Sequence, residues 1–279
     1  MATEIALAAS IVMNSVAKNR LLAAPRVIDR LEDCFFYHAM ELPGFGLIPA
    51  HWDLRGRFDD YMGGVSVAGK SVLDVGTASG FLSFEAEERG ATRVLSFDQS
   101  DGARQTFLPF KDKPYSRDHK AWAEQYRAEI ERWKNAYWLA HRLLQSKAEV
   151  FYGDIYDLPM ELGQFDIALV GSVLEHLSDP VTALASIARL TRETMVVVTP
   201  LLETEEPLAR FEGRADKPEA DFTWWVYSLG IYREVFGMLG FGIAQVTRAD
   251  YYYMYGGRFE TRSTIVARRN PEPLPDEQR

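Results

Sequence analysis

A short apolar segment that ends in a glycine-rich turn constrains the fold of this chain more than any other feature. Residues 71–75 form a strand-like run, residues 76–80 form the turn, and residues 81–89 have the pattern of a helix. A helix after a strand carries the chain back to start the next parallel strand. The segment therefore predicts that an α/β fold begins near Lys70.

The alternation of strands and helices continues to residue 268. Further strand-like runs lie at 93–98, 149–154, 165–170 and 195–199, and helical patterns lie at 118–145 and 180–190. Residues 241–250 and 261–268 resemble a closing hairpin. We expect a doubly wound, mostly parallel, seven-stranded sheet of the Rossmann-like type, covered by helices on both faces and finished by an antiparallel strand.

The pattern divides the chain into three parts. Residues 1–61 are predicted to form a helical N-terminal cap or lid, residues 62–269 the α/β domain with a helical insertion at 111–146, and residues 270–279 a flexible tail. The apolar segment 5–16 lacks preceding basic residues and is too short to span a bilayer. It is expected to pack on the domain, on a partner subunit or over the active site.

Charge and cysteine content narrow the functional classes. The formal net charge is −9, which opposes a general nucleic-acid binder, although a local basic patch stays open. A single cysteine, Cys34, excludes an intramolecular disulfide and fits a reducing compartment. We expect a cytoplasmic protein that acts on a small molecule, without a membrane span, and a homodimer is compatible with the sequence.

Acidic side chains stand at the ends of three successive predicted strands. They are Asp74, Asp98 and Asp154. The carboxyl ends of parallel strands meet at one edge of a sheet, where α/β proteins bind their ligands. A carboxylate such as Asp98 can accept both hydroxyls of a ribose, while Asp154 can accept from an amino group with Ile155 packed on the ring. The glycines of the turn let the backbone approach a ligand closely.

Together these motifs resemble the donor-binding signature of the class I S-adenosylmethionine-dependent methyltransferases. The resemblance is carried by the sequence VLDVGTASG at 72–80, by Asp98 and by Gly153-Asp154-Ile155, and covers about residues 70–268. It implies S-adenosylmethionine as the cofactor. The implied donor-binding residues are Arg55, Asp74, Gly76, Thr77, Ala78, Gly80, Asp98, Gln99, Asp154, Ile155, Gly171 and Ser172. Ala78 stands where the family often has glycine, and we expect a negative φ there.

Two alternatives concern this site. A dinucleotide-binding loop would place its third glycine at Phe81 or Leu82, whose bulk disfavours close helix packing against a pyrophosphate. Arg55 is a candidate for the donor carboxylate, but it can equally form a surface ion pair with a nearby aspartate, Asp53, Asp59 or Asp60.

A narrower resemblance is to the branch that methylates the 5-oxygen of wobble uridine in tRNA and to related small-molecule O-methyltransferases. Its motifs are Tyr37-His38, Glu41-Leu42-Pro43, Asp53-Leu54-Arg55, residues 76–84 and the sequence LEHLSDP at 174–180. O-methylation of a small hydroxylated molecule, such as a sugar, glycoside or natural product, is the leading prediction. A tRNA wobble-uridine O-methyltransferase and a non-catalytic S-adenosylmethionine-binding regulatory subunit remain as alternatives.

Transfer of a methyl group to an alcohol requires removal of a proton. His176 follows the fourth predicted strand and is the first candidate for the general base; its alternative role is to form a pocket wall or orient the acceptor. Glu175 and Asp179 are the reserve bases, and Asp179 can instead cap the helix that starts at Pro180. Candidate substrate-binding residues are His38, Trp138, Trp224 and Tyr232. No residue spacing indicates a metal site.

Overall fold

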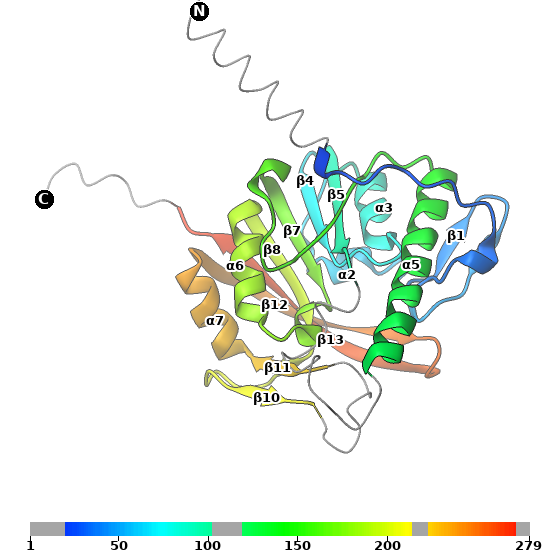
Figure 1. Ribbon diagram of the computed structural model, residues 1–279. Helices are drawn as coiled ribbons and strands as arrows, with labels where there is room; N and C mark the ends of the chain where they lie inside the picture. The colour runs from blue at the N-terminus through cyan, green and yellow to red at the C-terminus, as the bar shows by residue number, and fades with distance from the viewer. Residues whose placement is uncertain (1–19, 102–118, 214–222, 272–279) are drawn as a thin grey trace, which may run out of the picture.

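The computed structural model describes residues 20–101, 119–213 and 223–271 (Figure 1). The predicted apolar helix at 5–16, the first residues of the insertion at 111–118 and most of the C-terminal tail lie outside the described residues. The side chains of residues 119–123 and 125 also lie outside that description.

The described residues form a central sheet in the order β3-β12-β13-β8-β7-β4-β5-β6. The bounds of its strands are β3 (Trp52–Asp53), β4 (Ser71–Val75), β5 (Arg93–Gln99), β6 (Glu149–Gly153), β7 (Phe165–Gly171), β8 (Thr191–Thr199), β12 (Phe241–Tyr253) and β13 (Arg258–Arg269). Strands β4 to β8 are parallel, and the hairpin β12–β13 joins β8 in antiparallel fashion through β13. This confirms the doubly wound prediction. The sheet has one strand more than the seven predicted, because β3 of the N-terminal segment pairs with β12.

Helices cover both faces of the sheet (Figure 1). One side carries α3 (Phe81–Glu88) and α5 (His119–Leu143), and the other carries α6 (Pro180–Leu190) and α7 (Leu229–Met238). Alternate residues of β4 point to opposite faces, so Val72 joins the hydrophobic cluster of α3 and α5 while Leu73 joins that of α6 and α7. A hydrophobic core therefore packs on each face of the sheet, and together the two cores fix the positions of the strand ends.

The described part of the N-terminal segment is mainly extended, which differs from the helical segment predicted. After η1 (Leu31–Asp33) it forms a hairpin of β1 (Met40–Leu42) and β2 (Gly46–Ile48), then β3 and the short α2 (Phe58–Tyr61). The turn glycines Gly44 and Gly46 have φ values of 82° and 69°, which interrupt a helix and favour a tight turn. The backbone N–H of Phe35 donates to the carbonyl of Arg132 at 3.0 Å, so this segment runs along α5.

A second, smaller sheet follows β8. It has the order β10-β11-β9, with β9 (Leu201–Leu202), β10 (Ala209–Phe211) and β11 (Trp225–Ser228). The backbone N–H of Trp224 donates to the carbonyl of Glu175 at 2.7 Å, which ties this sheet to η3 (Leu174–His176) beyond the end of β7. A further turn, η2 (Met160–Leu162), precedes β7.

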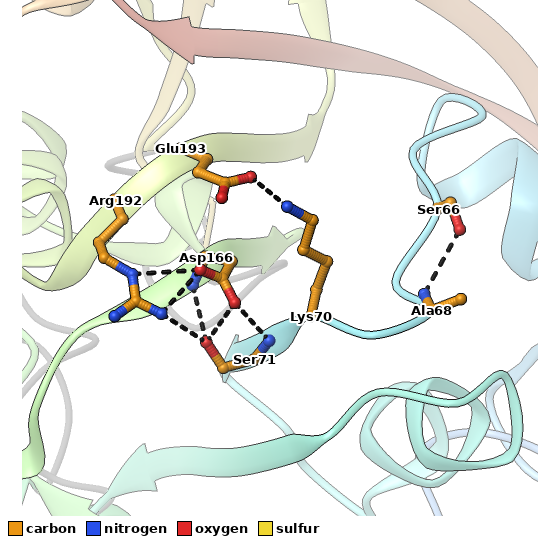
Figure 2. Close-up of polar contacts among 7 residues, drawn as sticks. All are labelled: Ser66, Ala68, Lys70, Ser71, Asp166, Arg192 and Glu193. Atoms are coloured by element: carbon orange, nitrogen blue, oxygen red, sulfur yellow. Dashed lines mark hydrogen bonds and ion pairs between the residues drawn. The ribbon is translucent and has the colours of Figure 1, made fainter.

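The amino ends of β4, β7 and β8 are fastened by a polar cluster of Ser71, Asp166 and Arg192 (Figure 2). Asp166 Oδ2 accepts from the backbone N–H and from Oγ of Ser71, each at 2.8 Å, and Arg192 Nη2 donates to Asp166 Oδ1 at 2.7 Å. The adjacent ion pair joins Lys70 to Glu193 at 2.7 Å. This cluster, called the Asp166 cluster below, leaves the carboxyl ends of the strands for the site. Among the described helices, none has the length and apolarity needed to cross a membrane.

Candidate active site

The glycine-rich turn joins β4 to α3 at the carboxyl edge of the sheet. Gly76 has a φ of 79°, and a Cβ atom there would lie 2.3 Å from Cγ2 of Val173. Only glycine allows the segment after β7 to pack this closely on the turn. The loop that carries Glu175 and His176 is therefore held directly beside the predicted donor-binding turn.

Ala78 has a φ of 50°, so the expectation of a negative φ is wrong. Its backbone N–H donates to Asp98 Oδ2 at 2.8 Å, which holds the residue in the left-handed region. This conformation costs an L-residue roughly 1–2 kcal/mol. The turn thus takes the left-handed conformation expected of glycine although its residue is alanine.

A buried chain of hydroxyl groups lies behind the turn. Ser83 Oγ donates to Asp74 Oδ2 at 2.7 Å, and the hydroxyl oxygens of Ser83 and Ser96 are 2.6 Å apart. Ser96 Oγ is in turn 2.8 Å from Tyr137 Oη. Because each hydroxyl has one proton, donation to Asp74 makes Ser96 the donor to Ser83 and Tyr137 the donor to Ser96. The Thr77 hydroxyl also lies 3.1 Å from Ser83 Oγ.

The carboxylates of this edge have unusual environments. Burial raises the pKa of Asp74 to about 6, against the opposing hydrogen bond from Ser83. Burial also raises the pKa of Asp98, although the backbone N–H groups of Gln99 and Ala78 donate to it. Asp154 instead is exposed, and its Oδ1 accepts from the backbone N–H of Tyr156 at 2.9 Å. Ile155 beside it is buried.

Buried polar atoms at this edge fit S-adenosylmethionine. Within the described residues, Asp74 Oδ1 and Gln99 Oε1 are buried and accept no hydrogen bond. Buried acceptors of this kind are rare unless a ligand or water satisfies them. Asp74 would hold a donor's ammonium group through charge, and Asp98 with Gln99 would hold its ribose hydroxyls. The turn and the ends of β4 and β5 therefore supply the acceptors that this cofactor requires.

Arg55 forms a surface ion pair, which is the second of the two roles predicted for it from sequence. Its Nη2 lies 2.7 Å from Asp53 Oδ2, and its side chain is 38% exposed. Gly171 and Ser172 lie at the end of β7, where a Cβ atom on Gly171 would approach Tyr61 Oη to 2.7 Å. Ser172 has a φ of 49° and faces the cavity described next.

A cavity of about 800 Å³, called the acceptor cavity below, opens beside this edge. Its walls come mainly from the N-terminal segment, α5, the loop after β7 and the β12–β13 hairpin, with one residue each after β8 and before β11. The residues that line it are Phe35, Tyr37, His51, Trp52, Tyr126, Glu129, Arg132, Trp133, Ser172, Glu175, His176, Pro200, Thr223, Tyr253, Arg258, Glu260 and Arg262. Its location next to the turn suits a methyl acceptor.

Of the three predicted bases, His176 and Glu175 line the acceptor cavity. Glu175 is buried, with Thr199 Oγ1 at 3.5 Å from its Oε2. Asp179 does not line the cavity, and its Oδ1 accepts from the backbone N–H of Thr182 at 3.0 Å. Asp179 is therefore the N-cap of α6, as its alternative interpretation predicted.

None of the four predicted substrate-binding residues lines the acceptor cavity. His38 lines a small cavity next to the acceptor cavity, and burial with the nearby His51 lowers its pKa to about 3. Trp138 and Tyr232 are buried in the two hydrophobic cores, and the buried Trp224 stacks on Phe211.

The charged residues Arg258, Glu260 and Arg262 line the cavity and were not predicted. Their period of two along β13 places them on one face of that strand, and this alternation was the available signal. The N-terminal segment reaches the site through Ser79, whose Oγ accepts from the backbone N–H groups of Tyr37 and His38 at 3.2 and 3.3 Å. The described residues contain no group of side chains able to hold a metal ion.

Comparison with known proteins finds a family match for the central part of the chain. Residues 73–198 match the family described as a methyltransferase domain, a stretch that begins in β4 and ends in β8. No curated protein sequence matches the chain.

Solved structures of similar shape include several methyltransferases. Magnesium protoporphyrin IX methyltransferase from Synechocystis PCC 6803 with bound SAM is 16% identical, with 78% of each chain covered and a TM-score of 0.48. The 1,6-didemethyltoxoflavin-N1-methyltransferase of Burkholderia thailandensis is 18% identical over 77% of this chain and 76% of that one, with a TM-score of 0.45. An S-adenosylmethionine dependent methyltransferase from Mesorhizobium loti is 16% identical over 77% and 97%, with a TM-score of 0.47.

The family match spans the strands whose ends carry Asp74, Asp98 and Asp154, and those strands have the order and direction expected for donor binding. Over residues 73–198 the chain therefore matches a methyltransferase domain, and the buried acceptors at the carboxyl edge of its sheet fit S-adenosylmethionine as the cofactor.

Proposed function

We propose that the enzyme methylates a hydroxyl oxygen of a small molecule bound in the acceptor cavity, with His176 as the general base. The observation that carries the proposal is the position of His176, which lines a cavity walled by aromatic side chains directly after β7. The segment between β7 and His176 packs on the glycine turn through Val173. A base at this place can reach an acceptor held against the donor site.

The size of the cavity supports a small acceptor. Its volume of about 800 Å³ falls in the range of about 300–1,000 Å³ that is typical of small-molecule sites. Bound S-adenosylmethionine supplies an activated methyl group, which goes to the acceptor oxygen. The aromatic walls orient the acceptor and exclude water, and the imidazole of His176 takes up the proton that the hydroxyl loses.

The first test is substitution of the base. We expect His176→Ala to lower turnover about 10²–10⁴-fold while donor affinity stays unchanged, because the ends of β4 and β5 hold the donor. His176→Gln keeps hydrogen bonding but cannot take up a proton at neutral pH, so it should not restore the rate. A matched control is His141→Gln on α5, where Nε2 of His141 lies 3.1 Å from the carbonyl oxygen of Ala148, just before β6, and the residue does not line the cavity.

The acceptor itself can be found by tracing labelled methyl groups from S-adenosylmethionine into a cell extract. We expect the label in small hydroxylated compounds and expect its incorporation to depend on His176. Label in tRNA would overturn the proposal in favour of the wobble-uridine alternative. Near-normal turnover of His176→Gln would reassign His176 as an orienting residue and make Glu175 the base to test.

A further inference from the structure

Three arginine side chains line the acceptor cavity, and each guanidinium lies over an aromatic ring that lines it too. The pairs are Arg132 over Phe35 at 5.8 Å, Arg258 over Tyr253 at 5.3 Å and Arg262 over Trp52 at 5.1 Å from the ring centroids. Stacking of this kind holds a guanidinium in place while its N–H groups stay directed along its own plane. The cavity thus presents fixed forks suited to a planar anion.

The hairpin wall has a surplus of positive charge. Glu260 accepts from both Arg258 at 2.6 Å and Arg262 at 2.9 Å, so one carboxylate is shared between two guanidinium groups. Arg132, which comes from α5 and not from the hairpin, donates to the backbone carbonyl of Cys34 at 3.0 Å, a partner that brings no negative charge. The other carboxylates of the lining, Glu129 and Glu175, come from α5 and η3 and not from the hairpin.

Another part of the cavity wall is a set of aromatic rings. Phe35 and Trp133 are stacked with their centroids 6.2 Å apart and an interplanar angle of 16°, and Tyr37 lies 5.1 Å from Trp133. Trp133 Nε1 is buried and donates no hydrogen bond within the described part of the chain. A flat ring with an acceptor oxygen fits this wall better than a saturated sugar, because a ring stacks and an oxygen satisfies the indole N–H.

We propose that the methyl acceptor is a planar aromatic acid. Its ring stacks on the wall that contains Trp133, its carboxylate binds the guanidinium groups of Arg258 and Arg262, and its hydroxyl group faces His176. The inference deepens the proposed function and rests on it for the hydroxyl group. Recognition of the carboxylate rests on the arginines and can be measured without turnover.

The test compares 4-hydroxybenzoate with 4-hydroxybenzamide, which has the same ring and hydroxyl group but no charge. Binding of each to the full chain saturated with the demethylated cofactor is measured by calorimetry. We expect the benzoate to bind about tenfold more tightly or better, because charge-assisted hydrogen bonds to a carboxylate are roughly twice as strong as neutral ones.

Two variants should change the affinity for the benzoate in opposite directions. Arg262→Gln should abolish its preference over the benzamide. Glu260→Gln should increase the affinity for the benzoate several-fold, because both arginines lose the carboxylate that they share. A general folding defect would weaken both variants and so cannot imitate this result. The control is Arg248→Gln on β12, whose side chain pairs with Glu203 at 2.7 Å away from the cavity.

Equal binding of benzoate and benzamide, or a preference that survives Arg262→Gln and Arg258→Gln, would overturn the inference. Tighter binding of phenyl phosphate than of 4-hydroxybenzoate would overturn the assignment of the anion as a carboxylate. Selective benzoate binding without methyl transfer to any hydroxylated aromatic acid would overturn the proposed function and leave the anion site standing. Methyl transfer to neutral hydroxyl compounds without any preference for the benzoate would overturn the inference alone.

Discussion

Asp74 shows how burial changes the role of a residue whose type is common. It lies in the middle of the sheet with 1% of its surface exposed, and its Oδ2 accepts a hydrogen bond from the hydroxyl of Ser83. The chain of hydroxyls from Tyr137 to Ser83 supplies that hydrogen bond in a fixed direction. The second oxygen, Oδ1, is left to accept from a ligand. We therefore expect this oxygen to accept from a cationic group of the cofactor.

The affinity for the donor should therefore depend on pH through Asp74. Burial raises its pKa to about 6, so the carboxylate form that attracts an ammonium group dominates only above that pH. We expect calorimetric affinity for S-adenosylmethionine to fall about tenfold per pH unit below pH 6, at which the group becomes protonated. Asp74→Asn should bind more weakly and show no change between pH 5 and 7.5.

The same group also affects stability. Because the folded pKa of Asp74 lies above its ordinary value of 3.8, the group disfavours the folded state increasingly as pH rises from about 4 to 6. Asp98→Asn is the control, since the pKa of Asp98 is also raised. The measurement is the free energy of unfolding as a function of pH, from denaturation curves between about pH 4 and 7. We expect its inflection near pH 6 to vanish in Asp74→Asn and to persist in Asp98→Asn. The reverse result would assign the effect to Asp98 and not to Asp74.

At the scale of elements, the start of α6 gives Asp179 a structural role. Asp179 accepts from the backbone N–H and the hydroxyl of Thr182, and Pro180 occupies the first helical position. Both features are typical of a helix N-terminus, because they satisfy or remove unpaired backbone donors.

Asp179→Ala should destabilise the fold by about 1 kcal/mol, the usual contribution of an N-cap, and leave the turnover number unchanged at temperatures where the protein is folded. Chemical denaturation and steady-state kinetics on the same preparation measure the two effects. Asp157→Ala is the matched control, because that exposed carboxylate pairs only at the surface with Arg189 at 3.2 Å. A large loss of turnover in Asp179→Ala would instead make Asp179 a candidate general base.

The aromatic residues of α5 show where prediction from sequence stops. Tyr126, Glu129 and Trp133 are spaced three and four residues apart, so they share one helix face, which lines the acceptor cavity. Trp138 follows Trp133 by five residues and turns toward the core. The sequence predicts the helix and its aromatic content, but only the packing of α5 against the sheet decides which face meets the substrate.

At the scale of the molecule, the meeting of the acidic strand ends at one edge was predictable from sequence, and the composition of the acceptor cavity was not. Asp74, Asp98 and Asp154 end their strands, and parallel strands bring such ends together whatever lies around them. The acceptor cavity instead joins residues from 35–52, 126–133, 172–176 and 253–262. Contacts between segments so distant in sequence depend on how the hairpin and the N-terminal segment pack, which local patterns do not encode.

The opposite edges of the sheet have separate tasks, and the Asp166 cluster makes this testable. Partial burial raises the pKa of Asp166, but hydrogen bonds from Ser71 and the ion pair with Arg192 outweigh burial and lower it to about 2. The cluster joins the amino ends of the strands whose carboxyl ends form the site (Figure 2). We expect Asp166→Asn to destabilise the fold by about 1–3 kcal/mol at pH 7, because the hydrogen bonds to a charged group are lost, without changing donor affinity.

The loss of stability should itself depend on pH. A folded pKa of about 2, below the ordinary 3.8, means that the charged form of Asp166 stabilises the fold above about pH 4 and that this contribution disappears as pH falls toward 2. Denaturation curves of the wild type and of Asp166→Asn should therefore converge over that interval. Glu193→Gln, which removes only the neighbouring surface pair with Lys70, should cost less than about 1 kcal/mol. If Asp166→Asn were as stable as the wild type at pH 7 but bound the donor more weakly, the amino edge would control the site and not the stability of the sheet.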